Sequence, residues 1–313
     1  MKKKSKRIIV GGLIIVCLLL AGTITAASAY FYYFAFEPQK PLNGKLPRKK
    51  QVRLAADQRW LKNESQQVWT ETAATQKLKL KAFYLPAEHS SKQTIIVAHG
   101  YQENHRLMAS YIRMLHNQGY NVLAPDDRGA GQSQGSYIGF GWPDRLDYLK
   151  WIELLIKRQG QEVQIGLFGV SMGAATVMMT SGEKLPRQVK AIIADSGYSS
   201  ITAELAYELK ARFGLPKEPL ITTAGWYSLL KNGFNFNDGN TVRQLYKNQL
   251  PLFLIHGQAD KFVPTRMVYQ NYTATRGIRR LWVVPKTGHA MAYYNYPKEY
   301  TQKVETFFKE YLK

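Results

Sequence analysis

Short, β-rich apolar runs alternate with longer amphipathic segments along most of this chain, and this alternation constrains the fold more than any other feature. The expected strands are 94–98, 121–125, 163–169, 189–195, 251–257 and 279–284, and the expected helices are 107–118, 143–158, 264–275 and those starting at 172 and 297. Such alternation is typical of a mostly parallel sheet covered by helices on both faces. Two further runs, 66–73 and 77–84, alternate like a pair of strands. The sequence therefore predicts one α/β domain over residues 66–313.

One segment, residues 199–248, interrupts this alternation without repeating the strand–helix unit. It is rich in aromatic side chains: Tyr207, Phe213, Trp226, Tyr227, Phe234, Phe236 and Tyr246. We interpret it as a small inserted lid of helices over the carboxyl edge of the sheet, the edge at which ligands bind in such folds. The alternative is that these aromatic side chains only pack against the domain.

The segment Gly169-Val170-Ser171-Met172-Gly173 places a serine between two glycines, after a buried strand and before a run of small residues. A serine on a sharp strand-to-helix turn has a strained backbone that exposes its hydroxyl, and side chains two residues away would collide. Glycine at both places removes that collision. This context predicts that Ser171 is a nucleophile rather than part of an ordinary turn.

A serine hydroxyl needs a base to remove its proton, and the base needs an acid that orients it. In this kind of fold the three residues follow the order serine, acid, histidine. His289 follows the last expected strand, and Asp260 follows the strand before it, within HGQADKFVP. Asp195, at the end of another strand, is the rival acid. We favour Asp260 and expect Asp195 to bind backbone groups near the turn.

Two backbone N–H groups are needed to bind the oxyanion that forms when a serine attacks a carbonyl group. Met172, directly after the serine, is expected to provide one. The other is expected from the loop His99-Gly100-Tyr101, and we choose Tyr101. The turn at residues 126–133 is interpreted as scaffold for this edge of the sheet.

The amino-terminal part predicts a membrane anchor. A basic tail, residues 1–7, precedes 29 uncharged residues, 8–36, which exceed the length of about 20 residues that spans a bilayer. The basic tail is expected in the cytoplasm and the rest outside the cell, with the aromatic residues 30–34 at the outer membrane interface. Ala27-Ser28-Ala29 leaves open cleavage after Ala29 as a signal peptide, although the apolar run is long for one. Residues 37–65 are interpreted as a basic stalk.

The charge distribution limits the possible partners. Residues 1–53 hold eleven Lys/Arg and one acidic residue, so much of the total net charge of +21 lies near the expected membrane surface. This location favours attraction to anionic lipid or cell-wall polymer, and no recognition module for nucleic acid accompanies it. The single cysteine, Cys17, excludes a disulfide framework in residues 18–313. No metal-ligand spacing or nucleotide-binding motif is present, so no cofactor and no metal site are predicted.

The motifs HGYQEN, DDRGAGQS, GVSMG, HGQADKFVP and GHA together resemble the α/β-hydrolase superfamily. With the predicted anchor, they are similar to its membrane-anchored bacterial cell-surface hydrolases, among serine aminopeptidase-like and acylglycerol lipase-like members. The resemblance covers about residues 66–311. It implies an α/β-hydrolase fold and a Ser171–His289–Asp260 triad, and it leaves the substrate open because this fold hosts many hydrolytic reactions.

Three functions remain as hypotheses. The first is an extracellular, single-pass, membrane-anchored serine hydrolase that cleaves carboxylic esters through an acyl-enzyme. The second is a peptidase that releases N-terminal residues, for which lid acids would have to hold the substrate ammonium group; the candidates are Glu204, Glu208, Glu218 and Asp238. The third is a non-catalytic cell-wall-binding module on a hydrolase scaffold.

Overall fold

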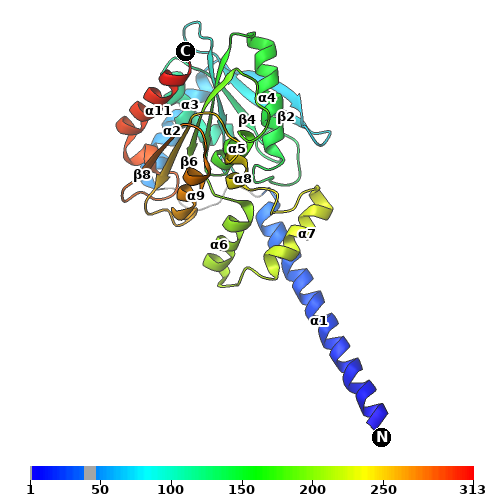
Figure 1. Ribbon diagram of the computed structural model, residues 1–313. Helices are drawn as coiled ribbons and strands as arrows, with labels where there is room; N and C mark the ends of the chain where they lie inside the picture. Colours follow the sequence, from blue (N-terminus) through cyan, green and yellow to red (C-terminus); the bar gives the residue numbers. More distant parts are fainter. Residues whose placement is uncertain (1, 39–46) are drawn as a thin grey trace.

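The computed structural model describes residues 2–38 and 47–313, and Figure 1 shows a domain from which one long helix projects. The described strands are β1 (Gln67–Thr72), β2 (Lys79–Leu85), β3 (Gln93–Ala98), β4 (Asn121–Asp126), β5 (Gln164–Val170), β6 (Val189–Asp195), β7 (Leu252–Gly257) and β8 (Arg279–Val284). They form one eight-stranded sheet in the order β1-β2-β4-β3-β5-β6-β7-β8. The pairs β1–β2 and β2–β4 are antiparallel and the others are parallel.

The described helices follow the predicted alternation closely. They are α1 (Lys2–Phe36), α2 (Arg48–Asn63), the 3-10 helix η1 (His105–Met108), α3 (Ala109–His116), α4 (Asp144–Gln159), α5 (Met172–Thr180), α6 (Ile201–Phe213), α7 (Leu220–Asn232), α8 (Thr241–Leu245), α9 (Arg266–Ala274), α10 (Ala292–Asn295) and α11 (Pro297–Tyr311). The fold is the predicted α/β-hydrolase fold, with a mostly parallel sheet between two helical layers.

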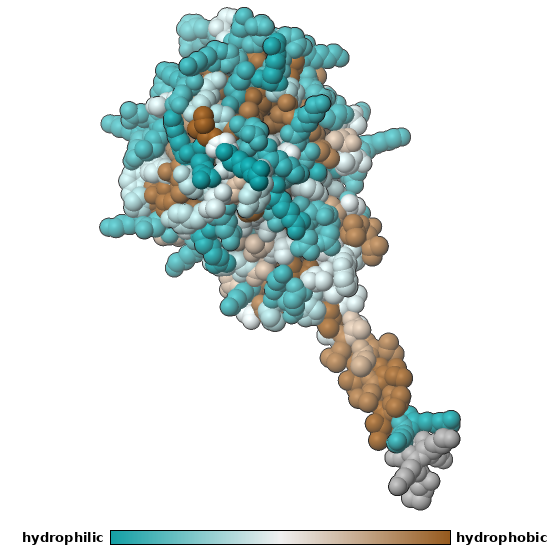
Figure 2. Space-filling model, viewed as in Figure 1, coloured by the Kyte–Doolittle hydropathy of each residue, from teal (hydrophilic) through white to brown (hydrophobic). Residues whose placement is uncertain are grey.

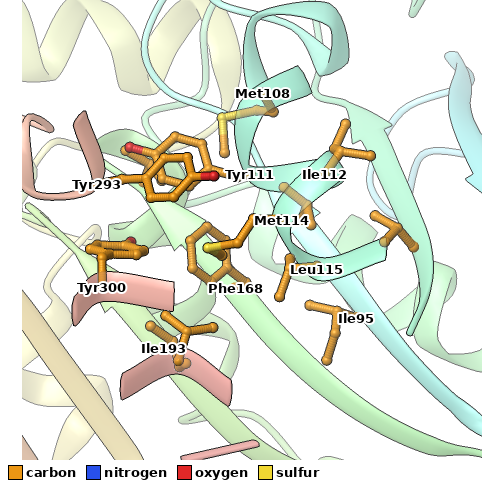
Figure 3. Packing of buried hydrophobic residues seen from close by; sticks show 14 of the residues in the cluster. Ile95, Met108, Tyr111, Ile112, Met114, Leu115, Phe168, Ile193, Tyr293 and Tyr300 are labelled. Carbon is orange, nitrogen blue, oxygen red and sulfur yellow. The ribbon is translucent and has the colours of Figure 1, made fainter. Parts of the chain in front are cut away.

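Alternate residues of each central strand supply the two hydrophobic cores. Ile95 and Val97 of β3 pack with α2, α3 and α11, whereas Ile96 and Ala98 pack with α4, α5 and α9. This alternation is the direct consequence of successive side chains pointing to opposite faces of a sheet. On the first face, Tyr111, Phe168 and the aromatic rings of the carboxyl-terminal helices stack into one cluster (Figure 3). Both faces are buried, which explains why the parallel strands are almost wholly apolar.

The region predicted to be a basic stalk, residues 37–65, is mainly helical. Residues 39–46 of it lie outside the described part of the chain, but α2 covers 48–63 and packs on α3. Leu54, Asp57 and Leu61 are buried on one face of α2, at a spacing that repeats with the helical turn. The interpretation of 48–63 as a stalk is therefore wrong, because this apolar face has a place in the core.

The outer end of α1 also differs from the expected membrane belt. Phe31 and Tyr32 are 6% and 1% exposed, because the last turns of α1 pack against α7 and the loops before α4. Phe36 stacks on Phe236 with ring centroids 4.9 Å apart. Tyr30 and Phe34, at 67% and 37% exposure, are the aromatic residues of the predicted belt that stay exposed. The helix therefore enters the domain as part of its third hydrophobic core.

Helices α6, α7 and α8 come from the segment predicted to be an inserted lid, 199–248. Ser200 caps α6 by accepting a hydrogen bond from the Ala203 N–H, and Gly214 ends it with a positive φ of 68°. In Figure 1, α6 and α7 project from the domain on the side where α1 joins it, and the carboxyl terminus lies at the opposite end. These helices thus lie beside the outer end of α1, and whether they move as a lid stays a prediction.

Candidate active site

Ser171 lies at the junction of β5 and α5 with φ 58° and ψ −119°, a backbone conformation that non-glycine residues rarely adopt. The two glycines around it are required by close backbone contacts. A Cβ on Gly169 would lie 2.2 Å from the Gly173 carbonyl oxygen, and one on Gly173 would lie 2.2 Å from the Ala98 carbonyl oxygen. The strained serine is therefore held between β5, β3 and the first turn of α5.

Replacing Gly173 with alanine is expected to lower the free energy of unfolding by about 1–3 kcal/mol, because the new methyl group overpacks this junction. Thermal unfolding of the full chain in detergent measures the effect. Gly22→Ala is the control, since a Cβ there meets nothing within 4 Å. Equal melting temperatures for the two variants would contradict this account of the turn.

Ser171, His289 and Asp260 lie in one hydrogen-bonded chain, although they come from three separate loops at the carboxyl edge of the sheet. His289 Nε2 lies 2.8 Å from Ser171 Oγ, and His289 Nδ1 lies 2.8 Å from Asp260 Oδ2. A carboxylate can only accept, so the Nδ1–H donates to Asp260 and Nε2 is left to accept the proton of the serine hydroxyl. This is the geometry required of a nucleophile, its base and an orienting acid.

The surroundings of Asp260 keep it ionised. Burial by itself would raise the pKa of this carboxyl group, but interactions with His256 and His289 lower the pKa to about 2. Its other oxygen, Oδ1, accepts hydrogen bonds from the backbone N–H groups of Phe262 and Val263, both at 2.9 Å. His256 Nε2 lies 3.3 Å from Asp260 Oδ2 and donates to the Val263 carbonyl oxygen at 2.9 Å. His256 thus supports the acid loop and has a structural role in this arrangement.

Asp195, the rival acid, has other partners. Its carboxylate accepts hydrogen bonds from Tyr300 Oη and Ser196 Oγ, both at 2.8 Å. The expected bond to backbone near the turn is made by its carbonyl oxygen instead, which accepts from the Ser171 N–H at 2.8 Å. Burial raises its pKa, and the bonds from Tyr300 and Ser196 oppose that effect. Ser196 Oγ accepts from the N–H of Ala290, the residue after His289, at 3.2 Å. Asp195 therefore supports the histidine loop indirectly.

Both residues expected to donate to the oxyanion, Met172 and Tyr101, line a cavity together with Ser171. Met172 opens α5, and the first N–H groups of a helix have no acceptor within the helix. The loop that carries Tyr101 lies against the serine, since a Cβ on Gly100 would be 3.6 Å from Ser171 Cβ. The Tyr101 hydroxyl donates to the carbonyl oxygen of Ala35, at the end of α1, at 2.7 Å. This bond ties the expected oxyanion loop to the amino-terminal helix.

Two cavities meet at Ser171. One, of about 100 Å³, lies under α6 and the end of α1. It is mostly apolar, and its lining includes Phe31, Phe34, Ala35, Met172, Leu205 and Phe213. The other, of about 320 Å³, lies on the side of His289 and is lined in part by Lys50, Leu54 and Glu103. A substrate with its reacting bond at Ser171 would extend into both, so we name them the α1-side cavity and the α2-side cavity.

The α1-side cavity contains one unusual polar group. Glu204 of α6 is 4% exposed, and neither carboxyl oxygen has a hydrogen-bond partner within the described residues. Burial raises its pKa well above 4.5, and Glu208 and Asp260 reinforce the shift. Glu208, which also lines this cavity, is paired with Arg212. Burial without a hydrogen-bond partner thus favours the uncharged form of Glu204.

The described residues contain no group of three or more His, Cys, Asp or Glu side chains arranged to hold a metal ion. Glu204 and Glu208 are predicted from the sequence only as possible acids for a substrate ammonium group, and the lining residues of α1 and α2 are not predicted. A signal for α1 does exist: Phe31, Phe34 and Ala35 follow the i, i+3, i+4 spacing of one helix face. These three residues line the α1-side cavity.

Comparison with known proteins gives consistent matches. Residues 89–215 match the family model described as serine aminopeptidase, S33. The chain is 30% identical over 224 residues to the uncharacterized protein YqkD of Bacillus subtilis (strain 168), which covers 72% of this chain and 73% of that protein. It is also 24% identical over 261 residues to putative esterase/lipase 3 of Mycoplasma genitalium, with coverage of 74% and 90%.

Among solved structures, the esterase Pf2001 of Pyrococcus furiosus superposes with a TM-score of 0.66 at 24% sequence identity. The match covers 88% of this chain and 100% of that one. At this level of identity the likeness concerns the fold, which agrees with the sheet order and the helical layers described above.

Proposed function

Because this chain belongs to the α/β-hydrolase superfamily, we propose that it is a serine hydrolase that cleaves carboxylic esters through a covalent acyl-enzyme. The observation that carries the proposal is the hydrogen-bonded chain from Ser171 through His289 to the ionised Asp260. An esterase and a putative esterase/lipase among the similar proteins support an ester over other acyl compounds.

In the first half of the proposed reaction, Ser171 Oγ attacks the ester carbonyl carbon while His289 Nε2 takes its proton. The Met172 and Tyr101 N–H groups bind the resulting oxyanion. When the tetrahedral intermediate collapses, the ester C–O bond breaks and His289 gives its proton to the departing alcohol. A water molecule then repeats the sequence on the acyl-enzyme and releases the carboxylic acid.

The two cavities suggest which part of the substrate lies where. His289 must protonate the leaving alcohol, and it lines the α2-side cavity. The alcohol is therefore assigned to the α2-side cavity, next to Lys50 and Glu103. The acyl group is assigned to the mostly apolar α1-side cavity, where burial favours the uncharged form of Glu204.

Hydrolysis of p-nitrophenyl esters from acetate to palmitate by the full chain in detergent tests the proposal. A fluorophosphonate probe, followed by peptide mapping, identifies the reacting serine. Ester hydrolysis together with a probe adduct on Ser171 would support it. Absence of both ester hydrolysis and the probe adduct would overturn it. An adduct without ester hydrolysis would point to another acyl substrate.

The proposed location is the outer face of the cell membrane, with α1 as an uncleaved anchor. The helix segment Lys6–Phe36 is long and apolar enough to cross a membrane, a property that a signal sequence shares. Ser28, inside the possible cleavage site, is 2% exposed and bonded to Thr223 of α7, and these contacts favour a retained helix. Protease digestion of intact cells, which should remove the domain and spare the basic tail, tests this orientation.

A second candidate function is a peptidase that releases N-terminal residues, and Glu204 is the observation that favours it. An unpaired buried carboxyl group beside Ser171 could hold a substrate ammonium group, with Glu208 nearby. Faster turnover of aminoacyl amides than of simple esters, lost in Glu204→Gln, would promote this function over the first.

The buried Glu204 also predicts a pH-dependent stability. Its folded-state pKa is raised above its unfolded value, so its contribution is fully present below the unfolded pKa and is lost as the pH rises through the folded pKa. The melting temperature of Glu204→Gln, relative to that of the wild type, should therefore increase as the pH rises above the ordinary glutamate pKa of 4.5. Glu218→Gln, an exposed change near α7, is the control. A margin that does not change with pH would contradict the buried, unpaired state.

A further inference from the structure

We propose that the outer end of α1 is a wall of the acyl-binding cavity and that the mouth of this cavity lies at the membrane surface, so that the substrate is an acyl ester held in the membrane. This inference rests on the proposed serine hydrolase function and assigns its substrate class. It gives α1 a part in substrate selection in addition to anchoring.

The wall is formed by three residues of α1. Phe31, Phe34 and Ala35 line the same cavity as Ser171 and Met172. The Ala35 carbonyl oxygen accepts the hydrogen bond from Tyr101, so the helix also contacts the loop expected to bind the oxyanion. An acyl chain bound at Ser171 would therefore lie directly against α1.

The mouth of the cavity is identified by the exposure of its lining. Most lining residues are buried or half-buried, and the exposed ones are Phe34, Arg212 and Phe213. The rings of Phe34 and Phe213 pack edge to face, with centroids 5.6 Å apart. The entrance to the α1-side cavity is thus an apolar gap between α1 and the end of α6, with one cation at its rim.

The height of this mouth follows from the length of α1. Twenty residues counted from Ile8, directly after Lys6 and Arg7, end at Ala27 and cross a hydrocarbon layer of about 30 Å. Phe34 lies seven residues further, which is about 10 Å at 1.5 Å per residue. The headgroup layer adds about 5–8 Å on each side of a bilayer. The mouth therefore lies about 2–5 Å beyond the headgroup layer, within reach of an acyl chain that leaves the membrane.

Helix α7, which packs beside the end of α1 near this mouth, presents an exposed apolar surface. Trp226, Leu229 and Leu230 are 59%, 48% and 88% exposed and lie on one face of α7, at positions i, i+3 and i+4. We call these three residues the α7 face. Contacts from Ser28 to Thr223 and from Tyr33 Oη to Tyr227 Oη (2.7 Å) fix α7 beside the outer end of α1.

A membrane is the occupant that fits the α7 face. Exposed apolar side chains that include tryptophan are typical of the interfacial region of a bilayer. Figure 2 shows that the hydrophobic surface of α1 runs up to the domain, where α6 and α7 join it. The α7 face continues this surface, because α7 packs along α1. A second copy of the chain is the competing occupant that the experiment below separates.

The first experiment tests the wall. Phe31→Ala should shift the preference of the full chain in detergent toward longer p-nitrophenyl esters, and Phe31→Trp toward shorter ones. The ratio of kcat/KM for octanoate to that for butyrate should change at least about tenfold between them, since one methylene group in an apolar pocket has an effect of this size. Tyr30→Ala, on the exposed side of α1, is the matched control. Equal chain-length profiles in both Phe31 variants would overturn the proposal.

The second experiment tests entry from the membrane. The full chain is reconstituted in phosphatidylglycerol–phosphatidylethanolamine vesicles that contain 4-methylumbelliferyl oleate, and 4-methylumbelliferyl butyrate is the soluble comparison. Leu230→Glu should lower the ratio of the oleate rate to the butyrate rate several-fold. Ile278→Glu should not lower this ratio. Ile278 is 57% exposed, but it directly precedes β8 and so lies at the amino-terminal end of the strands, away from the carboxyl edge that carries the active site.

The outcomes separate the two proposals. An unchanged ratio in Leu230→Glu, with normal butyrate hydrolysis, would overturn membrane entry and leave the serine hydrolase function intact. If the wild type shows neither butyrate hydrolysis nor fluorophosphonate labelling, the proposed function itself is refuted. If Leu230→Glu lowers the ratio of the oleate rate to the butyrate rate and also changes the oligomeric state, measured by crosslinking, the α7 face is instead a contact with a second copy of the chain.

Discussion

Replacing Ser171 with alanine is expected to lower kcat/KM for p-nitrophenyl esters by roughly 10⁴-fold or more, because the variant cannot form an acyl-enzyme. Ser171 is the residue whose hydroxyl oxygen lies 2.8 Å from His289 Nε2, so its loss removes the attacking atom itself. The measurement is the initial rate of the full chain in detergent, followed over a range of ester concentrations.

Ser196→Ala is the control for this result. Ser196 also has a positive φ, of 61°, and lies at the end of a neighbouring strand, but it bonds to Asp195 and to the Ala290 N–H. We expect this change to cost far less activity, and fluorophosphonate labelling to persist. A rate of Ser171→Ala within tenfold of the wild type would refute the acyl-enzyme.

Replacing Asp260 with asparagine is expected to lower kcat by about 10⁴-fold, the effect of losing the acid that fixes the histidine tautomer. The asparagine side chain could present an N–H to His289 Nδ1, which would leave Nε2 protonated and unable to accept the serine proton. The pKa of Asp260 is lowered to about 2, so the wild-type side chain is a carboxylate that can only accept at any ordinary assay pH. The loss of activity in Asp260→Asn should therefore be seen across the whole assay range.

Asp195→Asn is the matched comparison, because Asp195 is the other buried acid at this edge of the sheet. Its carboxylate contacts Tyr300 and Ser196, so its replacement should reduce the melting temperature more than the rate. If Asp195→Asn lost more activity than Asp260→Asn, the assignment of the acid would be wrong.

The sequence predicts the central sheet well because its information is local. The strands β6 and β8 have the bounds read from their apolar runs, 189–195 and 279–284. The glycines at 169 and 173 are likewise explained by local geometry, because the backbone of a strand-to-helix turn of this kind comes too close to its neighbours for a side chain. Periodicity and turn chemistry are properties of short segments, and they are visible without the tertiary structure.

What the sequence does not predict depends on contacts between distant segments. One of the two partners of the Asp195 carboxylate is Tyr300, which lies 105 residues further along the chain. Residues 48–63 carry so many basic side chains that they suggest a stalk, although Leu54 and Leu61 lie seven residues apart on one helical face. The aromatic residues after Ala29 suit a membrane interface or a protein core equally well. Their surroundings decide between the two, and α7 supplies those surroundings only in the folded chain.

The unbroken helix α1 has a consequence for how such an enzyme would meet its substrate. A flexible tether would let the domain search a volume, but α1 runs from Lys2 to Phe36 without a break, and its last turns are packed into the domain. If α1 anchors the domain as proposed, the active site keeps a fixed height above the bilayer and searches in two dimensions. Its rate is then set by the number of substrate molecules per unit area of membrane, so that inert lipid dilutes the substrate as effectively as added water would dilute a soluble one.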